Sequence, residues 1–169
     1  MKKILFVIIL AVIIAGSASA DYSEDKFGVG IMGGWYGDWE GWGWGHSVLS
    51  LKIPGIPVFW GIHMGFRSGF FHLGVSGDYY LFHEPLVSAI NLNWYLGIGG
   101  WLNVGFNPGY FSFGARLPIG LSWHLLEIVN KIGLELFAEF APSLGIMVAP
   151  DFHFPSGGWP IALGVRLWF

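Results

Sequence analysis

The segment Ile90-Asn-Leu-Asn-Trp-Tyr-Leu-Gly-Ile-Gly-Gly-Trp-Leu-Asn-Val104 decides the fold class of this chain. Its apolar residues recur at every second position, whereas asparagines, glycines and two aromatic residues occupy the positions between them. A period of two is typical of a β-strand, because successive side chains of a strand point to opposite faces. The uncharged stretch from Pro85 to Ala115 also has too many glycines and polar residues for a membrane-spanning helix.

The same alternation recurs along the rest of the chain. Pro54 and Gly55 mark a turn between two shorter stretches of this kind. The pattern predicts an all-β protein with eight antiparallel strands, near 27–35, 47–53, 56–66, 71–81, 90–104, 111–122, 134–141 and 161–169.

The composition excludes several classes of protein. Hydrophobic residues make up 54% of the chain and charged residues only 11%. The chain therefore has too few charged residues to cover the surface of an ordinary soluble protein. Fifteen Phe, ten Trp and six Tyr argue against disorder, and the absence of cysteine excludes a disulfide framework. The formal charge of −3, with no basic cluster beyond the first three residues, argues against nucleic acid as a partner.

The N-terminus predicts secretion. Lys2 and Lys3 precede an apolar run from Ile4 to Ile14, and Ala18-Ser19-Ala20 supplies a small-x-small cleavage site. The alternative is a short membrane anchor, but the run is too short to cross a bilayer, which needs about 20 residues. We therefore expect a signal peptide at 1–20 and a mature domain at 21–169.

Eight alternating strands after a signal peptide predict an eight-stranded antiparallel transmembrane β-barrel of the bacterial outer membrane, with both termini in the periplasm. A lipocalin-like soluble barrel is the alternative, but the polar faces carry too few charges for a water-exposed exterior. We expect periplasmic turns at Pro54–Gly55 and His83–Leu86, and external loops at Gly37–His46 and Pro150–Gly158. Trp123–Lys131 is long enough for one helical turn.

The chain ends in an alternating stretch that stops at phenylalanine. Gly164, Leu167, Trp168 and Phe169 match the terminal signature by which outer-membrane barrels are recognised by the barrel assembly machinery, although Ala162 stands where a polar residue is usual. The alternative is an amphipathic edge strand with no signalling role.

Four segments carry a resemblance to a known family. Residues 50–60, 77–80, 114–123 and 134–142 resemble small outer-membrane barrels of spirochaetes such as Borrelia and Treponema. The resemblance implies an OmpA-like, eight-stranded barrel at the cell surface that contacts host proteins. It defines no catalytic residues.

The few charged residues of the last three strands fall on one face. Arg116, Glu135, Glu139 and Arg166 all occupy the predicted interior, where pairing costs less than exposure to lipid. We predict that they form one charge network in the lumen. Because eight strands leave an interior about filled by side chains, the network is expected to plug the barrel rather than to conduct.

Motifs for metal, cofactor or catalysis are weak. His63 and His72 point inward on adjacent strands, but two histidines without a third ligand do not make a metal site. Gly28-x-Gly30-x-x-Gly33 lies within a strand rather than between a strand and a helix, so no dinucleotide cofactor is predicted. His46 and Ser47 are direct neighbours that point to opposite faces of a strand. No enzyme, cofactor or metal is expected.

The first expected loop is rich in tryptophan. Trp39, Trp42 and Trp44 stand near acidic residues and offer flat apolar faces to sugar rings or a protein partner, whereas Trp35 and Tyr36 suit an aromatic girdle. The sequence predicts a monomer with outer-membrane lipid around it and a structural or surface-interaction role. The alternatives are an adhesin that binds host proteins or glycans through its loops, a narrow pore, and a lipid-modifying enzyme.

Overall fold

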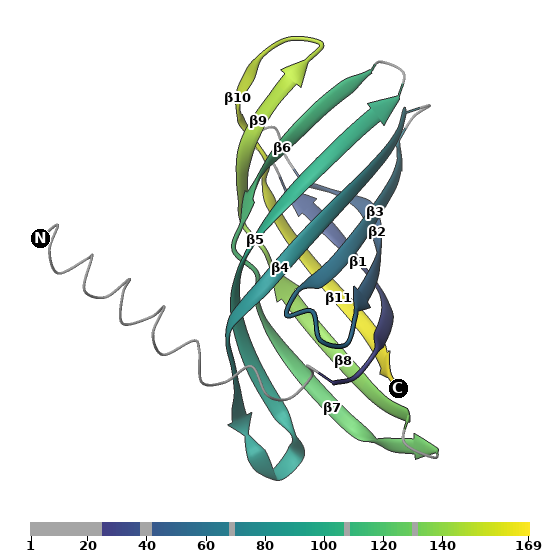
Figure 1. Cartoon of the computed structure of the whole chain (residues 1–169). Coiled ribbons are helices and arrows are strands. Elements are labelled where there is room, and N and C mark those ends of the chain that lie inside the picture. Colours follow the sequence, from purple (N-terminus) through teal and green to yellow (C-terminus); the bar gives the residue numbers. More distant parts are fainter. Residues whose placement is uncertain (1–24, 38–41, 68–69, 107–108, 130–131) are drawn as a thin grey trace, which may run out of the picture.

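The computed structural model describes residues 25–37, 42–67, 70–106, 109–129 and 132–169, and they form a closed antiparallel β-barrel of eight strands (Figure 1). The predicted all-β, eight-stranded antiparallel barrel is thus confirmed. The predicted signal peptide at 1–20 lies outside the described residues. The elements are β1 (Gly28–Gly37), β2 (Trp42–Lys52), β3 (Phe59–Arg67), β4 (Phe70–Val87), the 3-10 turn η3 (Ser88–Ile90), β5 (Leu92–Phe106), β6 (Tyr110–Arg116), β7 (Ile119–Val129), β8 (Ile132–Phe140), β9 (Ser143–Ala149), β10 (His153–Ser156) and β11 (Trp159–Trp168).

Three of the eight strands are interrupted, which is why eleven segments make eight strands. β6 and β7 form one strand, β8 and β9 the next, and β10 and β11 the last. A proline stands at or beside each interruption, and proline has no N–H for the ladder. Pro118, Pro142 and Pro160, here called the proline row, accept backbone hydrogen bonds of 2.8–3.0 Å from a neighbouring strand. The three prolines therefore accompany the interruptions of three adjacent strands, and their carbonyls remain hydrogen-bonded.

The first and last strands close the ring. β1 pairs with β11 over ten residue pairs, and the two strands lie side by side (Figure 1). The stagger of the strands can be followed from Ser47 through directly opposite residues on neighbouring strands. In one direction, the path crosses β1, β11 and β8 and reaches Leu121. In the other direction, it crosses β3, β4 and β5 and reaches Phe111. These two end points lie ten residues apart on one continuous strand. With this stagger, the strands are tilted by roughly 35–45° from the barrel axis. The point midway between Phe111 and Leu121, near Arg116, therefore lies across the barrel from Ser47 at the same height along the axis.

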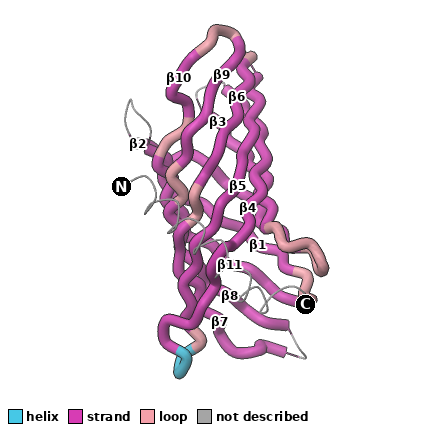
Figure 2. The backbone as a smooth tube through the Cα atoms, turned by 60° about the vertical axis from the view of Figure 1, so that its left-hand side comes forward, coloured by secondary structure: helices cyan, strands magenta, loops and turns pink. Residues whose placement is uncertain are grey.

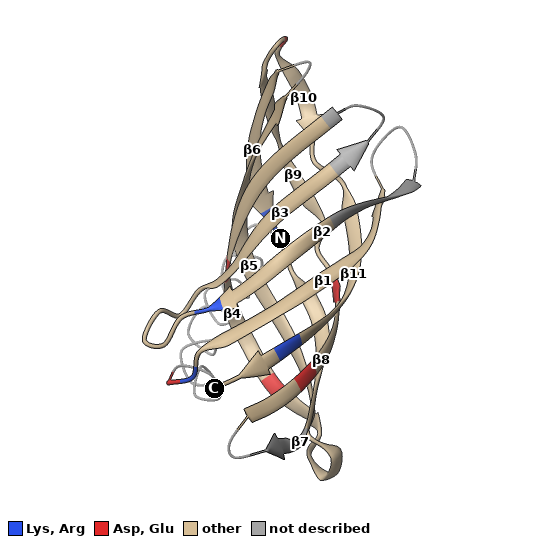
Figure 3. Cartoon of the chain, turned by 90° about the vertical axis from the view of Figure 1, so that its right-hand side faces the viewer, with Lys and Arg blue, Asp and Glu red and all other residues tan. Residues whose placement is uncertain are grey.

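The two faces of the wall differ in polarity. Outward side chains are predominantly apolar, as at Ile31 (65% exposed) and Leu163 (58% exposed), and Figure 3 shows long stretches of wall without charge. The interior holds hydroxyl, imidazole and charged groups. Among the side chains that the structure describes, the buried charged ones are Lys52, Asp78, Arg116, Glu135, Glu139 and Arg166.

Two expected connections were wrong. His83–Leu86 is strand rather than turn, because β4 continues to Val87 and the chain reverses at η3 and Asn91 (Figure 2). Asn91 takes a φ of 55°, a left-handed conformation that asparagine tolerates better than most residues. Trp123–Lys131 holds no helical turn in its described part, since β7 runs to Val129.

The expected loop Gly37–His46 is shorter than its sequence suggests. β1 extends to Gly37 and β2 begins at Trp42, so pairing between these strands uses most of the segment. Likewise, β10 takes four residues of the expected loop Pro150–Gly158. In both cases glycine and proline were interpreted as loop residues, although cross-strand pairing holds them in a ladder.

Candidate functional site

The lumen is the place where this fold concentrates polar chemistry. Six charged side chains are buried there, three basic and three acidic among the described residues, so their formal charges cancel. They come from β2, β4, β6, β8 and β11 because alternation sends every second side chain of these strands inward.

The first group of contacts surrounds Arg116. Its guanidinium pairs with Glu139 and, at 3.1 Å from Nε, with Asp78, and all three side chains are more than nine-tenths buried. The Tyr95 hydroxyl donates a 3.0 Å hydrogen bond to Glu139 Oε2. Two carboxylates therefore share one guanidinium, and Tyr95 on β5 ties the group to the wall beside β7. Charges removed from water require such partners.

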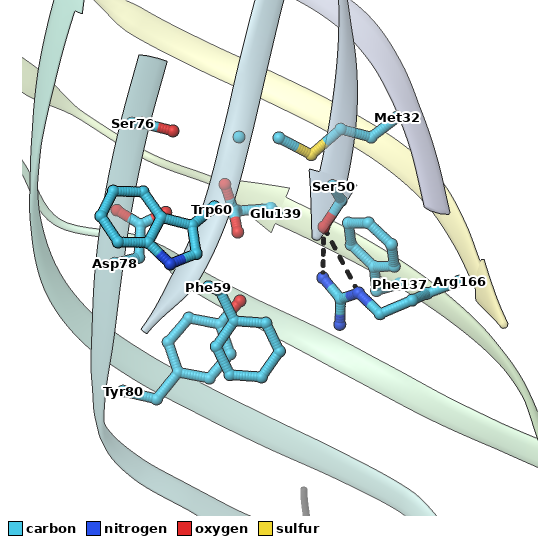
Figure 4. Close-up of a pocket in the computed structure, with 11 residues that line it drawn as sticks. Met32, Ser50, Phe59, Trp60, Ser76, Asp78, Tyr80, Phe137, Glu139 and Arg166 are labelled. Carbon is cyan, nitrogen blue, oxygen red and sulfur yellow. Dashed lines mark hydrogen bonds between the residues drawn. The ribbon is translucent and has the colours of Figure 1, made fainter. Parts of the chain in front are cut away.

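The second group surrounds Arg166. Arg166 Nη1 lies 2.8 Å from Glu135 Oε2, and the same oxygen accepts a 2.8 Å hydrogen bond from the Trp168 indole. The guanidinium also donates to Ser50 Oγ at 2.9 Å (Figure 4). Its carbon lies 4.8 Å from the Phe59 ring centroid, and the rings of Phe137 and Trp168 lie at 4.6 and 5.4 Å. Aromatic rings thus enclose a cation that is neutralised by one carboxylate.

Stacked rings fill the lumen beside these ion pairs. Tyr80 stacks between Phe59 and Tyr95, with centroid distances of 4.2 and 4.5 Å. The pocket between Met32, Ser50, Tyr80 and Glu139 offers only about 10 Å³, about the space of one water molecule (Figure 4). At this level, stacked rings and ion pairs surround a space for about one water molecule.

Histidines line the lumen above and below this level. His63 Nε2 lies 2.8 Å from Ser76 Oγ, and His83 Nε2 lies 3.2 Å from Ser122 Oγ. The ring of His72 packs over the inner side of Gly65. Within the described ranges, no three His, Asp or Glu side chains are grouped as a metal ion requires.

The four charged residues predicted to form one network lie together in the lumen as two ion pairs. Arg116 pairs with Glu139, and Arg166 pairs with Glu135. The pairing follows the register, since Arg166 stands directly opposite Glu135 on the neighbouring strand.

Sequence reasoning missed several partners. Asp78, Tyr95 and Ser50 were not assigned to the predicted charge network. The parity of the alternating strands was the available signal, because it sends all three inward. That Asp78 meets Arg116 depends on strand order and stagger, which parity does not contain.

The other predicted site residues have different surroundings. Trp42 and Trp44 belong to strand β2 and not to a loop, and Trp39 lies outside the described residues. At the C-terminus, Gly164, Leu167 and Trp168 belong to β11, which pairs with both β1 and β8. Phe169 exchanges backbone hydrogen bonds with Phe27.

Comparison with known protein families, characterised proteins and solved structures finds no match for this chain. In the described ranges, no helix has the length and apolar character needed to span a membrane.

Proposed function

We propose that this chain is a monomeric, integral β-barrel of the bacterial outer membrane, with a closed lumen and a structural or surface-interaction role. The observation that carries the proposal is the inverted polarity of the wall: buried charge inside, and exposed apolar side chains outside. In water, this arrangement would expose the apolar wall and bury ions at a cost. In a bilayer, it matches each face to its surroundings.

Ring closure supports the same proposal. Hydrocarbon offers no hydrogen bonds to backbone groups, so a sheet in a bilayer must pair its first strand with its last. Pairing of β1 with β11 meets this requirement. We propose that both termini lie in the periplasm, that the C-terminal stretch ending in Phe169 guides assembly, and that the chain is related to the small spirochaetal barrels it resembles.

The closed lumen favours a role other than transport or catalysis. A space of about 10 Å³ between Tyr80, Glu139 and Arg166 does not pass a hydrated ion. Each described Ser–His contact lies on the inner wall, and Ser76 and Ser122 are buried. We therefore propose that the protein acts through its outer surface and its ends.

An exposed aromatic pair favours surface binding as the second candidate function. Phe152 lies between β9 and β10 and is 72% exposed, and Phe154 belongs to β10 and is 60% exposed. Aromatic side chains on a hairpin offer apolar contact area to a host protein or glycan. Replacing both by serine is expected to abolish such binding while leaving the barrel folded.

The decisive experiment refolds residues 21–169 into phosphatidylcholine vesicles and follows flotation in a density gradient. We expect the protein to float with the vesicles after an alkaline carbonate wash, and to migrate differently on gels with and without boiling. Residues 21–169 that stay soluble without lipid or detergent, or that wash off the vesicles, would contradict the proposal.

A further inference from the structure

A short row of inward-facing residues crosses three neighbouring strands in the lumen. Gly61 on β3 stands directly opposite Ser50 on β2 and directly opposite Ser76 on β4. Both serines are buried. Because glycine has no side chain, the position between the two serines leaves room in the lumen.

The two arginines of the lumen reach this row from different sides of the barrel. Arg166 on β11 donates two hydrogen bonds to Ser50 Oγ, from Nε at 3.3 Å and from Nη2 at 2.9 Å. Arg116 on β6 donates from Nη1 to Ser76 Oγ at 3.5 Å. Each arginine also forms an ion pair with a glutamate. The row of Ser50, Gly61 and Ser76 therefore lies between the two ion pairs.

The pocket of about 10 Å³ described above lies against this row (Figure 4). Ser50, Gly61 and Ser76 line it together with Asp78 and Glu139. An internal water needs a space of about this size and about two to four polar partners. The two hydroxyl and two carboxylate groups supply such partners, and all four residues are more than nine-tenths buried. The pocket thus has the size and the polarity of a site for a single water molecule.

The hydroxyl group of Ser50 indicates what the pocket binds. Ser50 Oγ uses its acceptor capacity for the two bonds from Arg166, and a hydroxyl also carries one hydrogen to donate. Among the described residues, no hydrogen bond donated by Ser50 is present. A water oxygen accepts such a hydrogen, whereas a metal cation does not. The formal charges of the six buried charged residues also cancel, so neutrality requires no bound ion.

We propose that this pocket binds one internal water molecule that joins the two ion pairs into a single network. The water accepts a hydrogen bond from Ser50, which Arg166 holds in place, and donates to a carboxylate of Asp78 or Glu139, both of which pair with Arg116. The site depends on the closed barrel and not on the proposed membrane location, so either proposal can fail without the other.

A high-resolution crystal structure of the refolded protein tests the site directly. We expect one density peak within hydrogen-bond distance of Ser50 Oγ and of a carboxylate oxygen of Asp78 or Glu139. A pocket without such a peak would overturn the proposal. Crystals grown with rubidium chloride in place of sodium chloride distinguish water from a cation, because an anomalous signal in the pocket would identify a cation site and would also overturn it.

Two substitutions at Gly61 test whether the water stabilises the barrel. A Cβ at this position would stand 2.6 Å from Ser76 Oγ, so Gly61→Ala and Gly61→Ser crowd the pocket equally. Only the serine brings a hydroxyl that replaces hydrogen bonds of the displaced water. We expect both variants to unfold at a lower urea concentration than the parent, and Gly61→Ser to unfold at a higher concentration than Gly61→Ala.

Gly164 on β11 provides the matched control. It is also an inward-facing glycine, but a Cβ there would meet the side chains of Phe137 at 2.3 Å and Met32 at 2.8 Å. At this apolar position we expect Gly164→Ala to be at least as stable as Gly164→Ser. Alanine at least as stable as serine at Gly61 too would overturn the proposed network. If neither Gly61 variant shows the heat-dependent gel shift of a folded barrel, the crystal structure of the parent decides.

Discussion

At the scale of single residues, we expect the substitution of Glu139 to destabilise the barrel strongly. It pairs with Arg116 and accepts a hydrogen bond from Tyr95, and all three groups are buried. Glu139→Ala leaves the buried Arg116 guanidinium with Asp78 as its one remaining ion-pair partner among the described residues, so we expect a loss of roughly 3 kcal/mol in unfolding free energy. Urea unfolding of the vesicle-inserted protein measures it. Glu84→Ala, at an exposed carboxylate, is the control, and equal stability of the two variants would contradict the ion-pair assignment.

Trp168 offers a more selective change. Trp168→Phe removes the indole N–H that donates to Glu135 and keeps an aromatic ring beside Arg166. We expect a loss of about 1–3 kcal/mol, because the carboxylate loses a buried donor. The same unfolding measurement applies, with Trp60→Phe on the half-exposed outer face as the matched control. A Trp168→Phe protein as stable as its parent would show that this bond adds nothing.

At the scale of elements, alanine substitutions at two glycines, Gly114 and Gly100, distinguish the effect of steric crowding from that of strand propensity. A Cβ at Gly114 would stand 2.3 Å from the Leu144 carbonyl oxygen and 2.6 Å from Gly145 Cα, both backbone atoms. A Cβ at Gly100 would meet nothing closer than 3.5 Å. We expect Gly114→Ala to destabilise the barrel by about 1–3 kcal/mol and Gly100→Ala to be neutral or slightly stabilising. The temperature at which each variant loses its heat-dependent gel shift ranks the stability of the two variants. A Gly114→Ala protein more stable than the Gly100→Ala protein would contradict the packing described for Gly114.

The strands were predictable because their signal is local. Alternation from Ile90 to Val104 fixes both the conformation and the face of each side chain, and one period of two serves all eight strands. The ends of the strands were not predictable from the sequence, because they depend on pairing partners that lie far away in the sequence. The predicted strand 134–141 ended before Pro142, yet β9 continues it beyond that proline and pairs with β6. The site followed the same division: parity predicted the inner face of Arg116, while its contact with Asp78 required strand order.

At the scale of the whole molecule, we propose that the side chains of the lumen act as a plug that determines what the barrel passes. In planar bilayers we expect no steady conductance from the parent protein, because rings and ion pairs leave about 10 Å³ between them. Tyr80→Ala with Phe59→Ala removes the centre and one end of the stack, so we expect resolvable ion currents. Phe140→Ala, on the outer face, is the control and should stay silent. Steady currents from the parent would contradict the plug.

Ring closure also sets the order in which the molecule can be completed. Gly28 pairs with Trp168, so the contact that closes the barrel joins residues 140 positions apart in the sequence. Contacts between residues this far apart in the sequence make folding slow, because the chain loses the conformational entropy of a long loop before the strand pairing stabilises it. Until β11 has emerged and docked on β1, the strands made before it leave two sheet edges unpaired. Synthesis and closure are therefore separate events, and the incomplete chain must be kept from aggregating between them.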